Sequence, residues 1–105
     1  MQMTITSRRA DLTAPIREHI RARIGAALDQ HASRIHRVEV LIDDENGPKG
    51  GYDQVCRVAV SLTNGQTLHH ERRGLDLYAN ISLVADKVKR RVGRQLAKLR
   101  DRKTR

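Results

Sequence analysis

Five basic side chains near the end of the chain are spaced so that they share one side of a helix. At about 100° per residue, their directions all fall within roughly 60° of that of Lys87, while the apolar positions of the same segment centre roughly 115° away. Acidic residues interrupt this pattern only at Asp86 and Asp101. A narrow file of cations beside a buried face is suited to lie along a phosphate backbone. We call this set the basic ridge, and it consists of Lys87, Arg90, Arg91, Arg94 and Lys98.

The excess positive charge is concentrated in the same part of the chain. Residues 75–105 contain ten Lys or Arg and three acidic residues, a net charge of +7, whereas residues 1–74 contain eleven against nine, a net charge of +2. A basic segment on a nearly neutral body indicates one dedicated surface for a polyanion, although a solubilising face would have a similar composition. Further arginines could extend this surface from the first predicted helix and the end of the fourth predicted strand: Arg21, Arg23, Arg72 and Arg73.

The scarcity of aromatic residues restricts the kind of nucleic acid that such a surface would bind. Tyr52 and Tyr78 are the two aromatic residues, and the chain has neither Phe nor Trp. Domains that read single-stranded bases stack those bases on exposed aromatic rings. We therefore expect binding to folded RNA through its shape and backbone, with an affinity that falls steeply as salt is added.

No set of residues has the spacing of a catalytic motif. His69 and Glu71 share one strand face and could supply two metal ligands, but no third ligand stands at motif spacing. Cys56 is in phase with apolar strand residues, which favours a buried structural thiol over a nucleophile. The acidic run from Asp43 to Glu45 could bind a cation but is more typical of a solvated turn, and GPKGG lacks the ending of a phosphate-binding loop. We expect no enzymatic activity, no metal, no cofactor and no small-molecule substrate.

Hydrophobic periodicity predicts the elements that position these residues. Apolar residues at every fourth position after Thr13 and Pro15 predict a helix from about residue 14, and a longer helix is predicted from Leu75 onward. The acidic and then Gly- and Pro-rich stretch 43–53 predicts a loop, and Asn64-Gly65 predicts a hairpin turn. Alternating patterns predict strands over residues 1–6, 35–43, 55–62 and 66–72.

The resulting order β-α-β-β-β-α predicts an α+β fold, in which two helices pack on one face of a four-stranded, mostly antiparallel sheet. A chain of 105 residues is long enough for one domain with a modest core. We expect that domain to span residues 1–100, followed by a basic tail over residues 101–105 that frays. The single cysteine, the lack of an apolar leader and the lack of a window with about 18 apolar residues predict a cytoplasmic protein without a membrane partner.

Three segments resemble the short hibernation-promoting factor and ribosome-associated inhibitor family. They are residues 1–6 (MQMTIT), residues 12–24 (LTAPIREHIRARI) and above all residues 76–99 (DLYANISLVADKVKRRVGRQLAKL). The resemblance implies the same order of elements and binding to rRNA of the small ribosomal subunit, in the channel between head and body. There the protein would overlap the sites of messenger and transfer RNA and silence idle ribosomes.

The same resemblance assigns roles to individual residues. It implies that Tyr78 and Ile81 pack against the body and that Asp76 lies near the start of the helix. The stretch 43–56 (DDENGPKGGYDQVC) is longer and more Gly-rich than the loop and strand start of the better-studied short members, and it resembles a less characterised branch of the family. Because the chain ends without the C-terminal domain that pairs ribosomes in long members, we expect a monomer on the ribosome and no direct ribosome dimerisation. The resemblance also implies which residues contact rRNA: Arg23, Lys87, Arg90, Arg91 and Arg94.

Two other interpretations remain open from the sequence. The chain could be a general double-stranded RNA or DNA binder without ribosome specificity, because the basic ridge alone does not choose between duplexes. The last helix could instead lie on a membrane surface, since it is basic on one side and apolar on the other. Its apolar side is needed to cover the sheet, however, and it lacks Trp and Phe, so we expect weak binding to liposomes.

Overall fold

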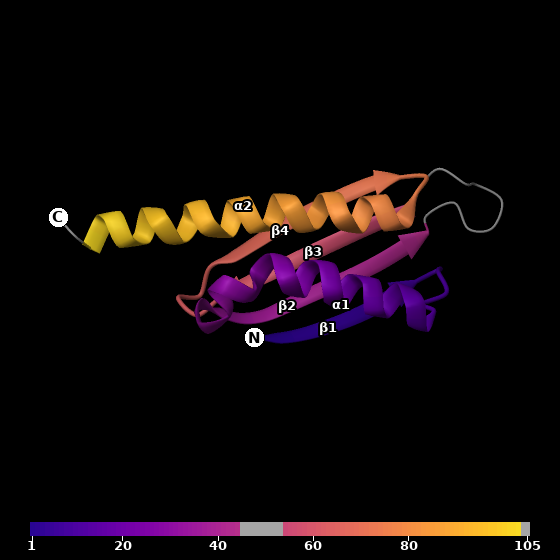
Figure 1. Ribbon diagram of the computed structural model, residues 1–105, viewed down its shortest axis with the longest axis horizontal. Helices are drawn as coiled ribbons and strands as arrows, with labels where there is room; N and C mark the ends of the chain where they lie inside the picture. Colours follow the sequence, from indigo (N-terminus) through magenta and orange to yellow (C-terminus); the bar gives the residue numbers. More distant parts are fainter. Residues whose placement is uncertain (45–53, 104–105) are drawn as a thin grey trace.

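The computed structural model describes residues 1–44 and 54–103, the last three of them by backbone alone. The helices and strands follow the predicted order, with a short 3-10 helix, η1, added after the first α-helix (Figure 1). Their bounds are β1 Gln2–Arg8, α1 Ala14–Leu28, η1 Asp29–Arg34, β2 Ile35–Asp44, β3 Gln54–Leu62, β4 Thr67–Gly74 and α2 Leu77–Lys103.

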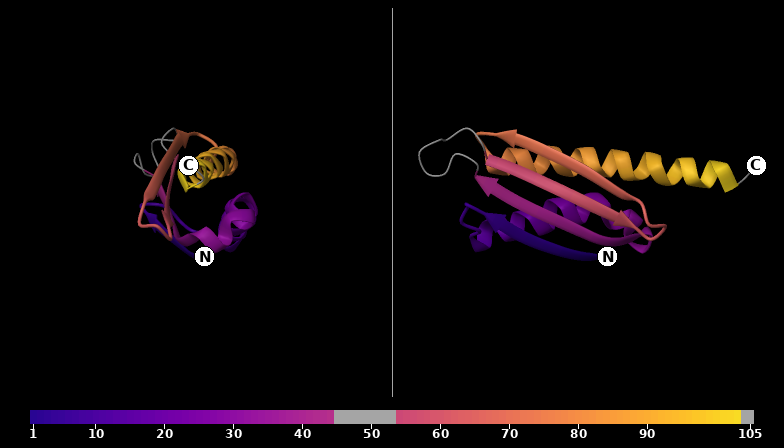
Figure 2. Two further views of the ribbon diagram at one scale, coloured as in Figure 1. Left: turned by 90° about the vertical axis from the view of Figure 1, so that its left-hand side faces the viewer. Right: turned by 180° about the vertical axis from the view of Figure 1, so that it is seen from behind.

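The four strands form one sheet in the order β1-β2-β3-β4. Strand β1 pairs in parallel with β2, because α1 carries the chain back along the sheet between them, and the other two pairs are antiparallel. Both helices lie on the same face of the sheet, which the left view of Figure 2 shows end-on. The predicted α+β architecture is thus confirmed, and no helix of the described residues covers the other face of the sheet, which we call the uncovered face.

The core lies between that sheet and the two helices. Alternate residues of the central strands point into it, as with Val40 of β2 and Val58 of β3, which are directly paired. The helices contribute one side each, and Ile24 of α1 and Val88 of α2 are completely buried. Cys56 belongs to the same cluster, so the predicted structural thiol is confirmed, and burial raises its pKa to about 12.

The helix starts are set by side chains that cap free backbone N–H groups. The hydroxyl of Thr13 accepts a hydrogen bond of 3.4 Å from the backbone N–H of Ile16, as its position before Pro15 predicts. At α2 the Asp76 carboxylate accepts a bond of 3.2 Å from the N–H of Ala79. The cap at Asp76 explains why α2 begins at Leu77, two residues after the predicted start.

The longer second helix extends beyond the sheet at its C-terminal end, as both Figure 1 and the right view of Figure 2 show. Of the two residues expected to pack near its start, Ile81 is fully buried. Tyr78 is 43% exposed, and its ring lies 4.8 Å from the ring of His19 on α1. The packing of Tyr78 is therefore a contact at the surface between the two helices.

The loop predicted over residues 43–53 begins later than expected. Strand β2 continues through Asp44, so Asp43 is a paired strand residue rather than part of a solvated turn. Residues 45–53, including Glu45, lie outside the described residues, as do residues 104 and 105. Helix α2 continues to Lys103, while the side chains from residue 101 onward are outside the described part.

Candidate nucleic-acid interface

The basic ridge lies along the solvent-facing side of α2. Its five side chains are all exposed, while Val84, Val88 and Val92 of the same helix are buried against the sheet. From Lys87 to Lys98 the ridge extends over about 16 Å, at 1.5 Å per residue. Among the described residues, no carboxylate forms an ion pair with any ridge side chain. The ridge therefore presents to solvent a row of positive charge that no described carboxylate neutralises.

One side of the ridge borders strand β4, which forms an edge of the sheet. The guanidinium of Arg91 donates a hydrogen bond of 3.3 Å to the backbone carbonyl of His69. One turn further on, the side-chain amide of Gln95 donates to Gln66 Oε1 at 3.0 Å. These bonds fix α2 along the β4 edge and hold Arg91 beside the strand.

Of the four arginines expected to extend the ridge, Arg72 is the one placed next to it. Arg72 alternates with Leu68 and His70 on the side of β4 that faces α2, and its side chain is exposed. Arg73, the next residue, points to the opposite face of the sheet, where its guanidinium lies 3.5 Å from a carboxylate oxygen of Glu71. Adjacent residues of a strand point to opposite faces, so this separation follows from strand geometry.

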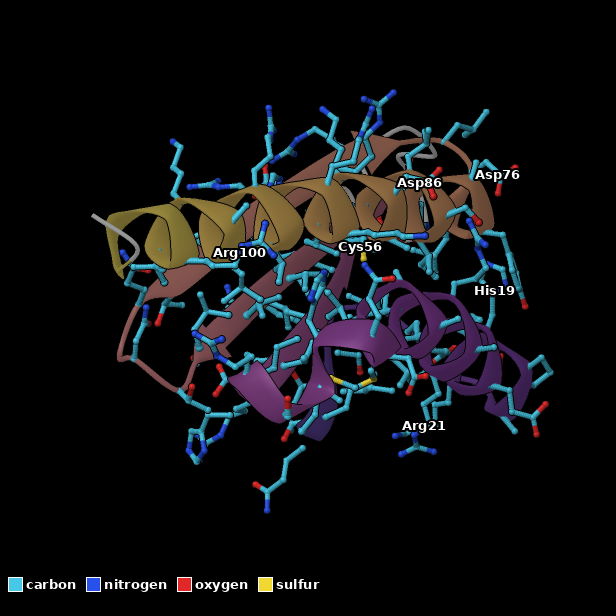
Figure 3. All side chains as sticks on the ribbon, turned by 60° about the vertical axis from the view of Figure 1, so that its left-hand side comes forward. His19, Arg21, Cys56, Asp76, Asp86 and Arg100 are labelled. Carbon is cyan, nitrogen blue, oxygen red and sulfur yellow. The ribbon has the colours of Figure 1, made fainter. Side chains whose placement is uncertain are left out.

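The two arginines of α1 lie away from the ridge. Arg23 donates from Nε to Ser82 Oγ at 3.2 Å, and its Nη2 lies 3.6 Å from Asp86, so it bridges the two helices on the far side of α2 from β4. The pair is largely exposed and contributes little to stability. Arg21 points away from α2 altogether (Figure 3). Arg72 therefore lies on the α2 side of β4, as the ridge does, whereas Arg21, Arg23 and Arg73 lie on other sides of the domain.

The uncovered face of the sheet differs from the ridge in its electrostatics. Arg57 in its middle lies 2.6 Å from Glu71 and 3.6 Å from Asp43, and Arg37 lies 3.3 Å from Glu39. Arg37 and Arg57 on this face thus have carboxylates beside them. A shallow hollow crosses this face, and the side chains that point to it include Thr4, Thr6, Arg8, Glu39, Arg57 and Glu71.

The pair His69 and Glu71, considered above as two metal ligands, does lie on this uncovered face. The Glu71 carboxylate accepts a hydrogen bond from Arg57 instead. Within residues 1–44 and 54–100, no group of three or more His, Cys, Asp or Glu side chains is arranged to hold a metal ion. The arrangement on this face is one of ion pairs.

Asp43 is an ionic residue whose role the sequence analysis missed. It is 1% exposed, and Arg9 donates two hydrogen bonds to its carboxylate, at 2.9 and 3.1 Å. The Arg9 hydrogen bond, with the positive charges of Arg9, Arg8 and Arg57, holds the pKa of Asp43 below its usual range despite burial. The expectation of a solvated turn is therefore wrong for Asp43. Its partner lies 34 residues away in the sequence, so no local pattern signals the pair.

His70 is a second residue whose position could not be recognised from its polar neighbours in the sequence, His69 and Glu71. Alternation with Leu68, an apolar residue, was the available signal that His70 faces the helices. Its Nε2 atom is buried and has no hydrogen-bond partner in the described part of the chain.

None of the helices in the described part of the chain has both the length and the hydropathy required to cross a bilayer.

Comparison with known proteins agrees with the fold and with the resemblance seen in the sequence. The chain is 32% identical over 102 residues to the ribosome hibernation promoting factor of Escherichia coli, and the aligned region covers 97% of this chain and 96% of that protein. It is 30% identical over 102 residues to the protein of the same name from Salmonella typhimurium, covering 95% and 98% of the two chains.

Solved structures share the fold at lower sequence identity. A ribosomal subunit interface protein from Coxiella burnetii superposes with a TM-score of 0.79 at 15% identity, covering 92% of this chain and 99% of the other. The N-terminal domain of Protein Y from Thermus thermophilus superposes with a TM-score of 0.73 at 20% identity, covering 90% and 98%. Residues 3–100 also match the family described as Sigma 54 modulation protein / S30EA ribosomal protein. With an exposed basic ridge on a shared fold and a family match over nearly its whole length, this chain belongs to the Sigma 54 modulation protein / S30EA ribosomal protein family.

Proposed function

We propose that this chain binds the small ribosomal subunit through rRNA phosphates laid along the basic ridge. In that position it blocks the channel for messenger and transfer RNA, inhibits translation and preserves inactive ribosomes. The names of the two relatives, ribosome hibernation promoting factors at 30% and 32% identity, support this role. The protein acts by occupying a site, and no chemical reaction is involved.

The observation that carries the proposal is the contrast between the two faces of the molecule. Ridge cations on α2 have no carboxylate partner among the described residues, whereas Arg37 and Arg57 on the uncovered sheet face are paired with acids. A phosphate contact requires a cation that is not already neutralised, and each contact releases counterions from the RNA. The ridge, together with Arg72, is therefore the surface we assign to rRNA.

The remaining parts of the proposal concern how the chain works as a unit. We assign residues 1–100 to a single ribosome-binding domain that acts in the cytoplasm as a monomer on the ribosome. Arg21, Arg23 and Arg73 lie on other faces, so contacts from them would require rRNA to approach the domain from more than one side.

Co-sedimentation with purified small subunits tests the proposal. A variant with Lys87→Glu, Arg90→Glu and Arg94→Glu reverses three ridge charges whose side chains are all exposed. The matched control reverses three exposed arginines elsewhere, Arg8, Arg17 and Arg34, and so changes the net charge by the same amount.

We expect the wild-type chain and the control to sediment with subunits at low salt and the ridge variant to stay in the supernatant. The ridge variant should likewise fail to inhibit a cell-free translation reaction. Retained co-sedimentation of the ridge variant would contradict the assigned surface. Equal binding of the wild-type chain to random duplex RNA and to subunits at matched salt would favour a general duplex binder over a ribosome-specific factor.

A further inference from the structure

His70 occupies an unusual position at the edge of the ridge. Its side chain points from β4 toward α2, opposite Val58 of the neighbouring strand in the pairing register. The Nε2 atom is buried and makes no hydrogen bond to any described residue. A buried imidazole nitrogen without a partner is unfavourable, because it has lost its hydrogen bonds to water and gained none. Such an atom is poised for a ligand that brings a hydrogen-bonding group.

The groups around His70 are cationic or neutral. Burial lowers the pKa of His70, and the positive charges of Arg91 and Lys87 on α2 lower it further because they disfavour the protonated ring. Arg90 and Arg94 line the same hollow as His70, along with Lys87, Lys89, Gly93, Ala97 and the neutral Gln30 of η1.

The strands add no negative charge on this side. Arg72 lies two residues further along β4 on the same side as His70, and the paired β3 residue, Val58, is apolar. The neighbouring acid, Glu71, points to the uncovered face, where it accepts a hydrogen bond from Arg57. Among the described residues, no carboxylate faces His70. The site thus combines a partnerless nitrogen with several cations and lacks an anion.

We propose that His70, together with Lys87, Arg91 and Arg94, forms a subsite for one phosphate group of the RNA backbone, and that His70 takes up a proton when this phosphate binds. In the complex, Nε2 carries the proton and donates a hydrogen bond to a phosphate oxygen. This inference rests on the proposed function for the identity of the RNA. The preference for a phosphate anion rests instead on the buried Nε2 atom of His70 and on the cations around it.

The direction of the pH effect follows from the charges. In the unbound chain, Lys87 and Arg91 disfavour the imidazolium and hold the pKa of His70 low. A bound phosphate offsets those charges, so the pKa of His70 is higher in the complex than in the unbound chain. Affinity therefore rises as the pH falls through the pKa of the complex and levels off below that of the unbound chain. Each pKa unit gained on binding corresponds to about tenfold in affinity.

Binding to purified small subunits, measured at about pH 6 and pH 8 at constant ionic strength, tests this coupling. The variant His70→Gln keeps an N–H donor but cannot titrate, and thermal melting shows whether it remains folded. His69→Gln is the matched control, because His69 is the adjacent residue on the opposite face of β4.

We expect the wild-type chain and His69→Gln to gain roughly threefold to tenfold more affinity than His70→Gln on going from pH 8 to pH 6. The same pH dependence in all three proteins would overturn the proposal.

A second measurement separates failure of this subsite from failure of the proposed function. The pKa of His70 is followed by NMR in the wild-type chain, first in chloride and then in inorganic phosphate at equal ionic strength. We expect the pKa of His70 to rise in phosphate. If the chain does not bind subunits but His70 responds to phosphate, the ribosomal role fails and the anion subsite stands. An unchanged His70 pKa in phosphate overturns the subsite even if subunits are bound.

Discussion

Neutralising part of the basic ridge should change the salt dependence of RNA binding by an amount that the structure sets. The ridge has five exposed cations without carboxylate partners among the described residues. Each phosphate contact contributes about −0.7 to −0.9 to the slope of log affinity against log salt concentration. Counting the ridge alone, without Arg72, five contacts contribute about −3.5 to −4.5 to the slope, which corresponds to a loss of roughly 100- to 500-fold between about 50 and 200 mM salt.

The perturbation is the triple variant Lys87→Gln, Arg90→Gln and Arg94→Gln, which removes three of the five contacts without adding negative charge. The remaining two contacts give a slope of about −1.4 to −1.8, so the same change in salt should weaken the variant only about 10-fold. The control, Arg8→Gln, Arg17→Gln and Arg34→Gln, loses the same net charge from other faces.

The assay is equilibrium binding of fluorescently labelled chain to purified small subunits over a series of salt concentrations at constant magnesium. The control should keep the slope of the wild-type chain within about one unit, because those three arginines make no phosphate contact in this account. If the ridge variant and the wild-type chain have parallel slopes, the ridge is not where the phosphates bind. A control that loses as much slope as the ridge variant would show that net charge alone determines binding.

Three further predictions concern the body of the domain. Replacing Asp43 by Asn should lower the free energy of unfolding by about 1–3 kcal/mol near neutral pH, because the buried carboxylate accepts two hydrogen bonds from Arg9. Because folding lowers the pKa of Asp43, its contribution to the free energy of unfolding is complete above the pKa of the unfolded chain, about 3.9, and is lost as the pH falls through the lower pKa of the folded chain. Urea titrations of the variant and the wild type should therefore converge in acid. The Cys56 thiol, whose pKa burial raises to about 12, should resist an aromatic disulfide reagent at about pH 8 and react only on unfolding, so rapid labelling of the native chain would refute the packing. Replacing Asn80 by Ala should cost about 1–3 kcal/mol in denaturant titrations, because its amide donates to the carbonyls of Gln54 and Gly74 at 2.9 and 3.3 Å; a loss well below 1 kcal/mol would show that these bonds do not tie α2 to the sheet.

The sequence predicts this fold well where a local pattern determines the structure. The alternation of Val38, Val40 and Ile42 requires a strand with one buried face, and all three are buried. Thr13 before Pro15 marks a helix start, and its hydroxyl does cap α1. The exposure of the ridge could be predicted for the same reason, because the helical period alone separates its cations from the buried side of α2.

Features that depend on contacts between distant segments could not be predicted. In the sequence Asp43 resembles part of an acidic turn. Only the parallel pairing of β1 with β2 places Arg9, the residue after β1, beside it. Arg21 and Arg23 lie about 200° apart around α1, so both cannot face α2, and the sequence alone does not say which one does. In the structure Arg23 lies beside Asp86, and Arg21 points away from α2 (Figure 3). The sequence also does not reveal which helix covers which strand, and this packing determines that His70 lies beside the cations of α2.

We expect α2 to meet rRNA with the side that carries the basic ridge. An electron cryo-microscopy map of the chain bound to the small subunit would show this orientation. The ridge and Arg72 should then lie within contact distance of rRNA phosphates, in the channel used by messenger and transfer RNA. A bound chain that turns its uncovered sheet face to the rRNA, with the ridge open to solvent, would contradict it.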